Sequence, residues 1–171
     1  MANLSAESLL LAGFTLAHAA WNVSDTTPEE LLCPLAILER SGERRLLRFE
    51  ADTQEQAIRA MKEAMAEARH VEESFAAARE GSWRPRGPDT DPEDVLTIDF
   101  WAPGMETTAS MLQPFRRAQA PRGFALLGAP LLVINGAILR PEDAVPAVEV
   151  LMEGVRSHSA VEPLWNGWQI E

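Results

Sequence analysis

Two tight-turn signals, each lying between apolar runs, constrain the fold of this chain more than any other sequence feature. The first, "SGE", separates "LLCPLAILER" (31–40) from "RRLLRFEA" (44–51). The second, "APGM", separates "DVLTIDFW" (94–101) from "TASMLQPFRR" (108–117), with proline and glycine where a type II turn prefers them. Because short loops of this kind join antiparallel strands, both pairs predict β-hairpins.

Two further segments have strand character. Residues 74–83 contain an alanine run that would suit a helix, but a helix from 52 to 80 would be long for a chain of this size, so a strand is favoured. Residues 123–136 predict one or two short strands that end at the tight turn Asn135-Gly136.

Three segments show the periodicity and the end signals of helices. Residues 5–22 form an amphipathic pattern with Ser5 as the N-cap and with Ser8 and Thr15 on the polar side. Residues 52–70 begin with a capping box. Residues 141–159 begin with proline at the first helical position, and their predicted inner face consists of Val145, Val148, Leu151, Met152 and Val155. The tail from residue 160 onward is predicted to be irregular.

These elements together predict an α+β fold in a single globular domain, residues 1–171. We expect a largely antiparallel sheet of five to seven strands, with about three helices packed mainly on one face.

Composition excludes several classes of function. The formal net charge of −11 disfavours nucleic-acid binding, because an acidic surface repels phosphate. The longest stretch almost without charge, residues 8–24, is broken by polar side chains and does not predict a membrane span. The start of the sequence lacks Lys and Arg, which argues against a signal peptide, and the lone Cys33 favours a reducing compartment. A cytoplasmic location is therefore expected.

No motif in the sequence carries recognisable catalytic chemistry. The three histidines, His18, His70 and His158, lie far apart and form no metal-binding spacing, so neither a metal site nor a cofactor is predicted. Cys33 precedes a proline and has no basic neighbour to activate it. The sequence therefore leans away from an enzyme.

Four residues are candidates for a binding site. His18 and Trp21 lie near the end of the first predicted helix, while Asp99 and Trp101 alternate with apolar residues on a predicted strand. His18 is expected at the rim of the polar side of its helix. Asp99 is expected to face solvent, or alternatively to line a pocket near Trp101 between the first helix and the sheet.

Two arginine groups are candidates for holding an anion. They contain Arg45 and Arg48 in one case and Arg116 and Arg117 in the other. The simpler interpretation is that these side chains lie on solvated strand faces and offset the acidic bulk of the chain.

Two classes of function follow. The favoured one is a non-catalytic, acidic binding or assembly module, of adaptor or inhibitor type, that acts on a protein partner. The alternative is a small-molecule-binding protein or an enzyme with a pocket between the first helix and the sheet.

A symmetric homodimer is also predicted. Pro114 suggests an edge or a bulge, and an edge strand ending there would leave backbone groups that need a partner. Phe115 adds apolar surface nearby. Trp165 and Trp168 in the tail are of a residue type enriched in interfaces. Alternatively, the tail folds back onto its own sheet and the chain is monomeric.

Overall fold

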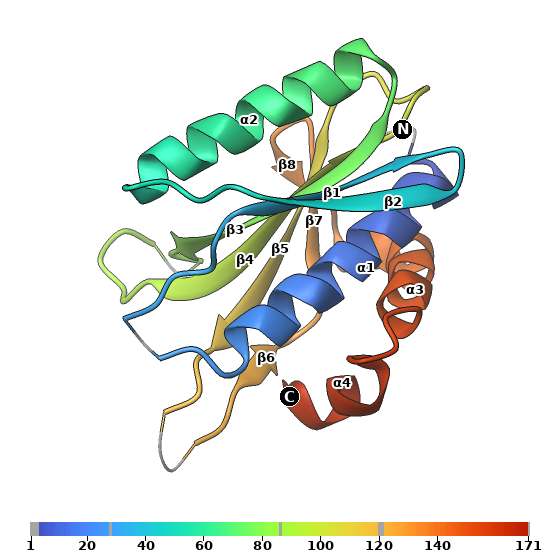
Figure 1. The fold of residues 1–171 in the computed structure, drawn as a ribbon. Coiled ribbons are helices and arrows are strands. Elements are labelled where there is room, and N and C mark those ends of the chain that lie inside the picture. The colour runs from blue at the N-terminus through green and yellow to red at the C-terminus, as the bar shows by residue number, and fades with distance from the viewer. Residues whose placement is uncertain (1–3, 28, 86, 120–121, 171) are drawn as a thin grey trace.

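A computed structural model describes residues 4–27, 29–85, 87–119 and 122–170. Within these residues the chain forms one sheet with helices on both faces (Figure 1). The helices are α1 (Ala6–Val23), α2 (Gln54–His70), α3 (Pro141–Arg156) and α4 (Glu162–Trp168). The strands are β1 (Leu35–Arg40), β2 (Glu43–Arg48), β3 (Ser74–Trp83), β4 (Glu93–Trp101), β5 (Ala109–Arg116), β6 (Ala125–Leu127), β7 (Leu131–Ile134), β8 (Ala137–Ile138) and β9 (Gln169–Ile170).

The sheet is antiparallel except at one edge. Its order is β2-β1-β3-β4-β5-β6-β9, with β7 pairing to β5 and β8 pairing to β7, and only β6 and β9 run parallel. Both predicted hairpins are confirmed, and residues 74–83 form a strand. Ser41 and Gly42 have φ values of 54° and 79°, as a two-residue hairpin turn requires. The very short β8 and β9 bring the strands above the expected number.

Two helix layers enclose the sheet, and the fold is α+β as predicted. Helices α1 and α3 pack together on one face, while α2 lies across β1 and β3 on the other (Figure 1). The predicted start of α1 is confirmed, because Ser5 accepts a hydrogen bond from the amide of Ser8. Thr53 likewise caps α2 through the amide of Gln56. None of the helices that the described residues form is long and apolar enough to cross a bilayer.

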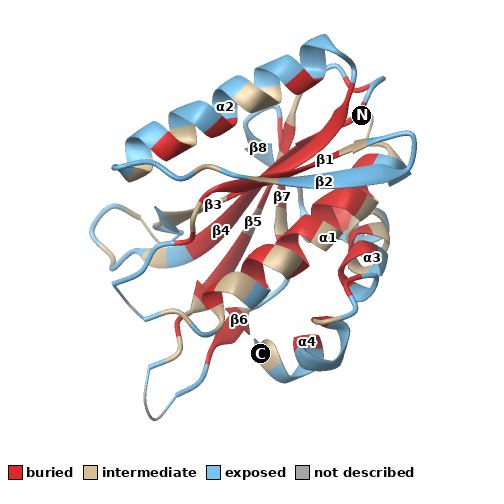
Figure 2. Cartoon of the chain, in the orientation of Figure 1, coloured by how far each residue is buried: buried red, intermediate tan, exposed pale blue. Residues whose placement is uncertain are grey.

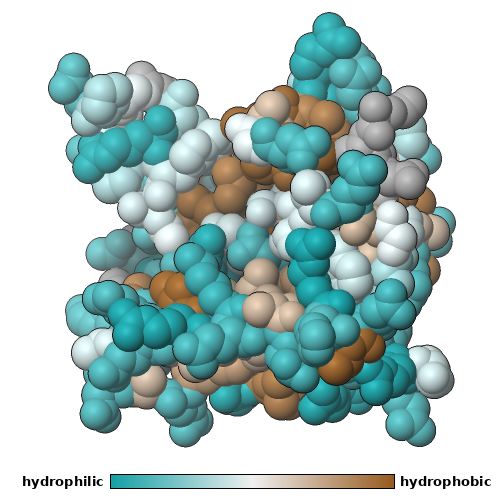
Figure 3. All heavy atoms as spheres, turned by 90° about the horizontal axis from the view of Figure 1, so that it is seen from above, coloured by the Kyte–Doolittle hydropathy of each residue, from teal (hydrophilic) through white to brown (hydrophobic). Residues whose placement is uncertain are grey.

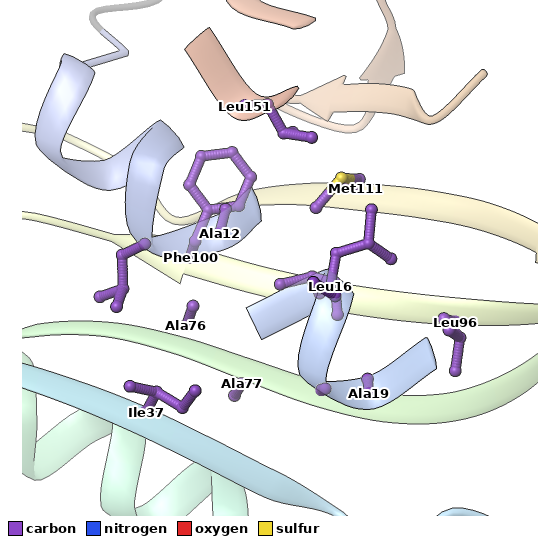
Figure 4. Close-up of a cluster of buried hydrophobic side chains, with 14 of the residues drawn as sticks. Ala12, Leu16, Ala19, Ile37, Ala76, Ala77, Leu96, Phe100, Met111 and Leu151 are labelled. Carbon is purple, nitrogen blue, oxygen red and sulfur yellow. The ribbon is translucent and has the colours of Figure 1, made fainter. Parts of the chain in front are cut away.

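Helix α1 is buried on two sides, against the sheet and against α3. Figure 4 shows Ala12 and Leu16 of this helix among sheet side chains such as Phe100 and Met111. Ser8 and Thr15, expected on a solvated face, are fully buried. Their hydroxyls donate to the carbonyls of Ser5 and Leu11 at 2.8 Å, which offsets the loss of water. The prediction of a solvated face there was wrong, because the fold covers α1 on more than one side.

Two glycines let α1 and α3 approach closely. A Cβ added at Gly13 would lie 1.9 Å from the carbonyl oxygen of Leu151, and one at Gly154 would lie 2.2 Å from that of Leu10. Both helices are therefore in backbone contact, which only glycine permits. This contact fixes the position of α3, which packs mainly on α1.

The predicted edge strand at Pro114 is wrong. Strand β5 pairs with β4 along its length and, on its other side, with β7 at Ser110–Leu112 and with β6 at Phe115–Arg116. Pro114 lies where this neighbour changes, so its missing N–H costs no ladder bond there. Between the two partner strands, the buried side-chain amide of Gln113 donates to the carbonyls of Pro114 and Gly128.

The tail is not irregular, because it forms α4 and folds back on its own sheet. Trp165 is buried, and Trp168 packs edge-on against Phe124 with ring centroids 5.1 Å apart. Phe115 is buried as well. The surfaces from which the homodimer was predicted are therefore internal, and a dimer would need a different contact.

Candidate functional site

The structure brings together two histidines that are 140 residues apart in the sequence. His18 Nδ1 lies 3.1 Å from Nε2 of His158, which follows the end of α3. Phe14 packs on the His158 ring at 4.8 Å, and Trp21 lies edge-on to both imidazoles. The result is an aromatic cluster that joins α1 to the α3–α4 connection.

The environment of this pair favours neutral imidazoles. Burial lowers the pKa of His18 below its ordinary value of 6.5, and the nearby His158 and Arg48 lower it further. Burial also lowers the pKa of His158. Among the described residues, the ring nitrogens bond only to each other, since His18 Nε2 and His158 Nδ1 have no partner. The pair thus lacks the nucleophile and the orienting carboxylate that a catalytic triad needs.

The other two residues of the predicted pocket, Asp99 and Trp101, lie on the opposite face of the sheet. Their pairing with Ala77 and Phe75 puts them on the α2 side, where the Arg69 guanidinium stacks over the Trp101 ring at 5.1 Å. Apolar side chains fill the space between α1 and the sheet (Figure 4). The sheet therefore separates Asp99 and Trp101 from His18 and Trp21, and the four residues do not line one pocket.

Asp99 is buried rather than solvated. Its carboxylate accepts a hydrogen bond from Ser110 at 2.6 Å and faces Arg79 at 3.8 Å. It lies on the part of the sheet that α2 leaves open, beside the partly exposed Leu112 and Val133. Figure 3 shows hydrophobic surface in a hollow between hydrophilic projections on this side of the molecule. The two charges here already pair with each other.

The four candidate anion-binding arginines lie in two places and are engaged within the protein: Arg45 and Arg48 on β2, and Arg116 and Arg117 at the end of β5, in a groove that also carries acidic residues. Arg45 pairs with Glu73 at 2.8 Å, and Arg48 donates to the side-chain oxygen of Asn22. Arg116 donates to the Gly123 carbonyl. These contacts do not form a common cradle for an anion.

Arg117 is buried, so it fits neither the anion-binding interpretation nor that of a solvated strand face. It forms an ion pair with the Glu80 carboxylate and donates to the hydroxyl of Thr26 at 3.0 Å. Glu80 in turn accepts from the amide of Leu32 at 3.1 Å. Arg117 and Glu80 therefore anchor the segment that follows α1, which is a structural role.

Within the described part of the chain, no three His, Cys, Asp or Glu residues are placed to hold a metal ion. Cys33 is half-buried, with its Sγ 3.7 Å from the carbonyl oxygens of Pro34 and Phe49.

The most extensive candidate site is a surface that the sequence analysis missed. Two open grooves of about 620 and 660 Å³ flank α3 and meet at Leu139. We call this the α3 surface, and its main apolar residues are Leu4, Leu9, Leu132, Ile134, Leu139, Val145, Val148, Val150 and Met152.

The α3 surface combines buried apolar residues at its base, such as Leu132, with partly exposed ones on α3. Val145 is 52% exposed, and Val148, Val150 and Met152 are half-buried. Figure 2 shows buried, intermediate and exposed residues along α3. The sequence pattern of α3 contained this signal, since Val145 and Val148 were assigned to an inner face. Without the positions of α1 and β7, nothing in the sequence indicated that the fold would leave them uncovered.

No protein-family model, curated protein or solved structure matches this chain.

Proposed function

We propose that this chain is a non-catalytic binding module that docks an amphipathic helical segment of a partner protein on the α3 surface. The observation that carries the proposal is the apolar lining of both grooves beside α3, including the exposed Val145. An exposed apolar groove is a common seat for the apolar face of a partner helix.

The energetics of burial support this use. Covering a valine or methionine side chain fully contributes about 1.5–3 kcal/mol relative to leaving it exposed. Val145, Val148 and Met152 follow the spacing of one helix side, so one partner segment can cover all three. These three residues line the groove of about 620 Å³, and the second groove shares Leu139 with it.

A small apolar molecule is the second candidate occupant. Both grooves have volumes in the range of pockets that take drug-sized ligands. Such pockets enclose most of the ligand, however, while these grooves are open along the helix, which favours a macromolecular partner. A thermal-shift screen with metabolites distinguishes the two, because a pocket ligand raises the melting temperature of the chain alone.

A cytoplasmic location belongs to the same proposal. It is supported by the use of a single cysteine, which is typical of chains in reducing compartments.

The test uses a synthetic amphipathic peptide with leucine on one helical face and glutamine on the other, labelled for fluorescence anisotropy. Wild-type protein is expected to bind it with a Kd in the micromolar range. The Val145→Asp variant should bind about tenfold more weakly or worse, because a charge in the groove loses the apolar contact.

Val71→Asp is the matched control. Val71 is also an exposed valine, but it lies at the end of α2 on the other side of the sheet. This variant should bind like the wild type. Equal loss in both variants, or no binding of the peptide to the wild type, contradicts the proposal.

A further inference from the structure

We infer that the segment bound by the α3 surface is basic, with Lys or Arg side chains placed to meet Glu149 and Glu153. This inference rests on the function proposed above and names the chemistry of the partner. It depends on the charges at the rim of the groove of about 620 Å³, which both glutamates line.

Glu149 and Glu153 form a like-charge pair. They are both exposed and one helical turn apart on α3. Like charges at this spacing destabilise a helix by about 0.2–0.5 kcal/mol. The ion pairs that the described residues form on α3 join Arg140 to Glu142 and Asp143, and none includes Glu149 or Glu153.

Glu153 has a second electrostatic cost. It lies in the last turn of α3, where the helix dipole places partial negative charge. Arg156 lies in the same turn and lines the same groove, so it offsets part of this charge. The groove still carries two carboxylates against one guanidinium, and a cation from a partner would relieve both repulsions.

A second copy of the chain is a poorer occupant than a basic segment. It would bring the same acidic helix and a further formal charge of −11 to this surface. A two-fold contact centred on α3 would also place Glu149 near its own symmetry mate, and such like-charge contacts disfavour association.

The experiment compares three peptides that share one leucine pattern and carry Lys, Gln or Glu on the other face. The Lys peptide should bind wild-type protein at least about tenfold more tightly than the Gln peptide, and the Glu peptide should bind most weakly. The advantage of the Lys peptide should shrink as salt rises, because exposed charges are screened.

Two double variants locate the source of this preference. In Glu149→Gln/Glu153→Gln the preference for the Lys peptide over the Gln peptide should fall several-fold. Glu63→Gln/Glu67→Gln is the matched control, since it removes two exposed glutamates one turn apart on α2. It makes the net charge less negative by the same amount and should leave the preference intact.

The possible failures are distinguishable. Equal binding of the Lys and Gln peptides, or an equal effect of both double variants, overturns the basic partner but leaves the proposed function standing. If no peptide binds, the proposed function itself is contradicted. Dimers of the chain alone that dissociate in Val145→Asp would identify a second copy as the occupant and overturn the inference.

Discussion

Helices α1 and α3 are similar in length and pack on each other, but the fold uses their apolar residues very differently. Of the 18 residues of α1, 11 are buried, whereas 4 of the 16 residues of α3 are. Helix α1 lies between the sheet and α3, so even its serine and threonine are covered. Helix α3 contacts mainly α1, and its remaining apolar side chains line open grooves.

In a chain without catalytic motifs, this difference distinguishes the apolar residues that stabilise the fold from those that are available to bind a partner. Apolar residues that are buried in the core contribute to folding, and their substitution should lower the free energy of unfolding. Apolar residues that the core leaves exposed add little stability, so their presence needs another explanation. The predictions below test whether substitutions around α1 lower stability while substitutions on the exposed side of α3 leave it unchanged.

The largest loss of stability is expected at the buried ion pair that anchors the segment after α1. Arg117→Met leaves the Glu80 carboxylate buried without its partner, which should cost about 3–5 kcal/mol in urea unfolding. The exposed pair between Arg59 and Glu55 supplies the control, since Arg59→Met should cost under about 1 kcal/mol. Similar losses in the two variants would show that Arg117 is not buried as described.

A somewhat smaller loss is expected where α1 and α3 touch. Gly13→Ala places a methyl group against the backbone of Leu151, and relieving that overlap should cost about 3 kcal/mol. Gly167→Ala in α4 meets open space and should be neutral or slightly stabilising. An unchanged unfolding midpoint in Gly13→Ala would mean that the helices are not in backbone contact.

A moderate effect is expected from pH. Because burial lowers the pKa of both His18 and His158, the unfolded chain binds protons below about pH 6.5 more readily than the folded chain does. The free energy of unfolding should therefore be fully present above that pH and decrease as the pH falls below it. Arg48, the charged neighbour that contributes to the shift at His18, acts in the same direction.

Melting temperatures measured from about pH 7.5 down to about pH 5.5 test this dependence. His158→Asn should make it shallower, because one of the two groups no longer titrates. His70→Asn removes an exposed histidine at the end of α2 and should leave the slope as in the wild type. A slope that is steeper at His158→Asn than in the wild type would refute the account of the pair.

The smallest effect on stability is expected at α3 itself. Val145→Asp should change the free energy of unfolding by no more than about 0.5 kcal/mol, since the side chain is exposed. The measurement is the same urea titration. A loss above about 2 kcal/mol would show that the core uses Val145 and would remove the basis of the comparison.

Local signals in the sequence were sufficient for much of the fold. Ser5 and Thr53 cap their helices as expected, because capping depends on residues three positions apart. The hairpin turns at Ser41-Gly42 and Asn135-Gly136 adopt positive φ values, which glycine and asparagine favour. Such features are decided within a few residues.

Contacts between distant segments were not predictable in the same way. The approach of His18 to His158 depends on how closely α1 and α3 pack, and the burial of Arg117 depends on the segment that follows α1. Pro114 indicated an edge because the sequence of β5 does not reveal that the strand beside it changes from β7 to β6 at this position. The α3 surface was missed for a related reason: an apolar helix face does not reveal whether another element will cover it.

The most direct test of the central claim is the location of peptide binding, measured by amide chemical shifts of the isotope-labelled protein titrated with the Leu/Lys peptide. The account predicts that the largest shifts fall on α3 and on the β7–β8 hairpin beside it, and that α2 and the open face of β4 are unaffected. Shifts centred on α2, on the open sheet face around Asp99, or spread evenly over the acidic surface would contradict it.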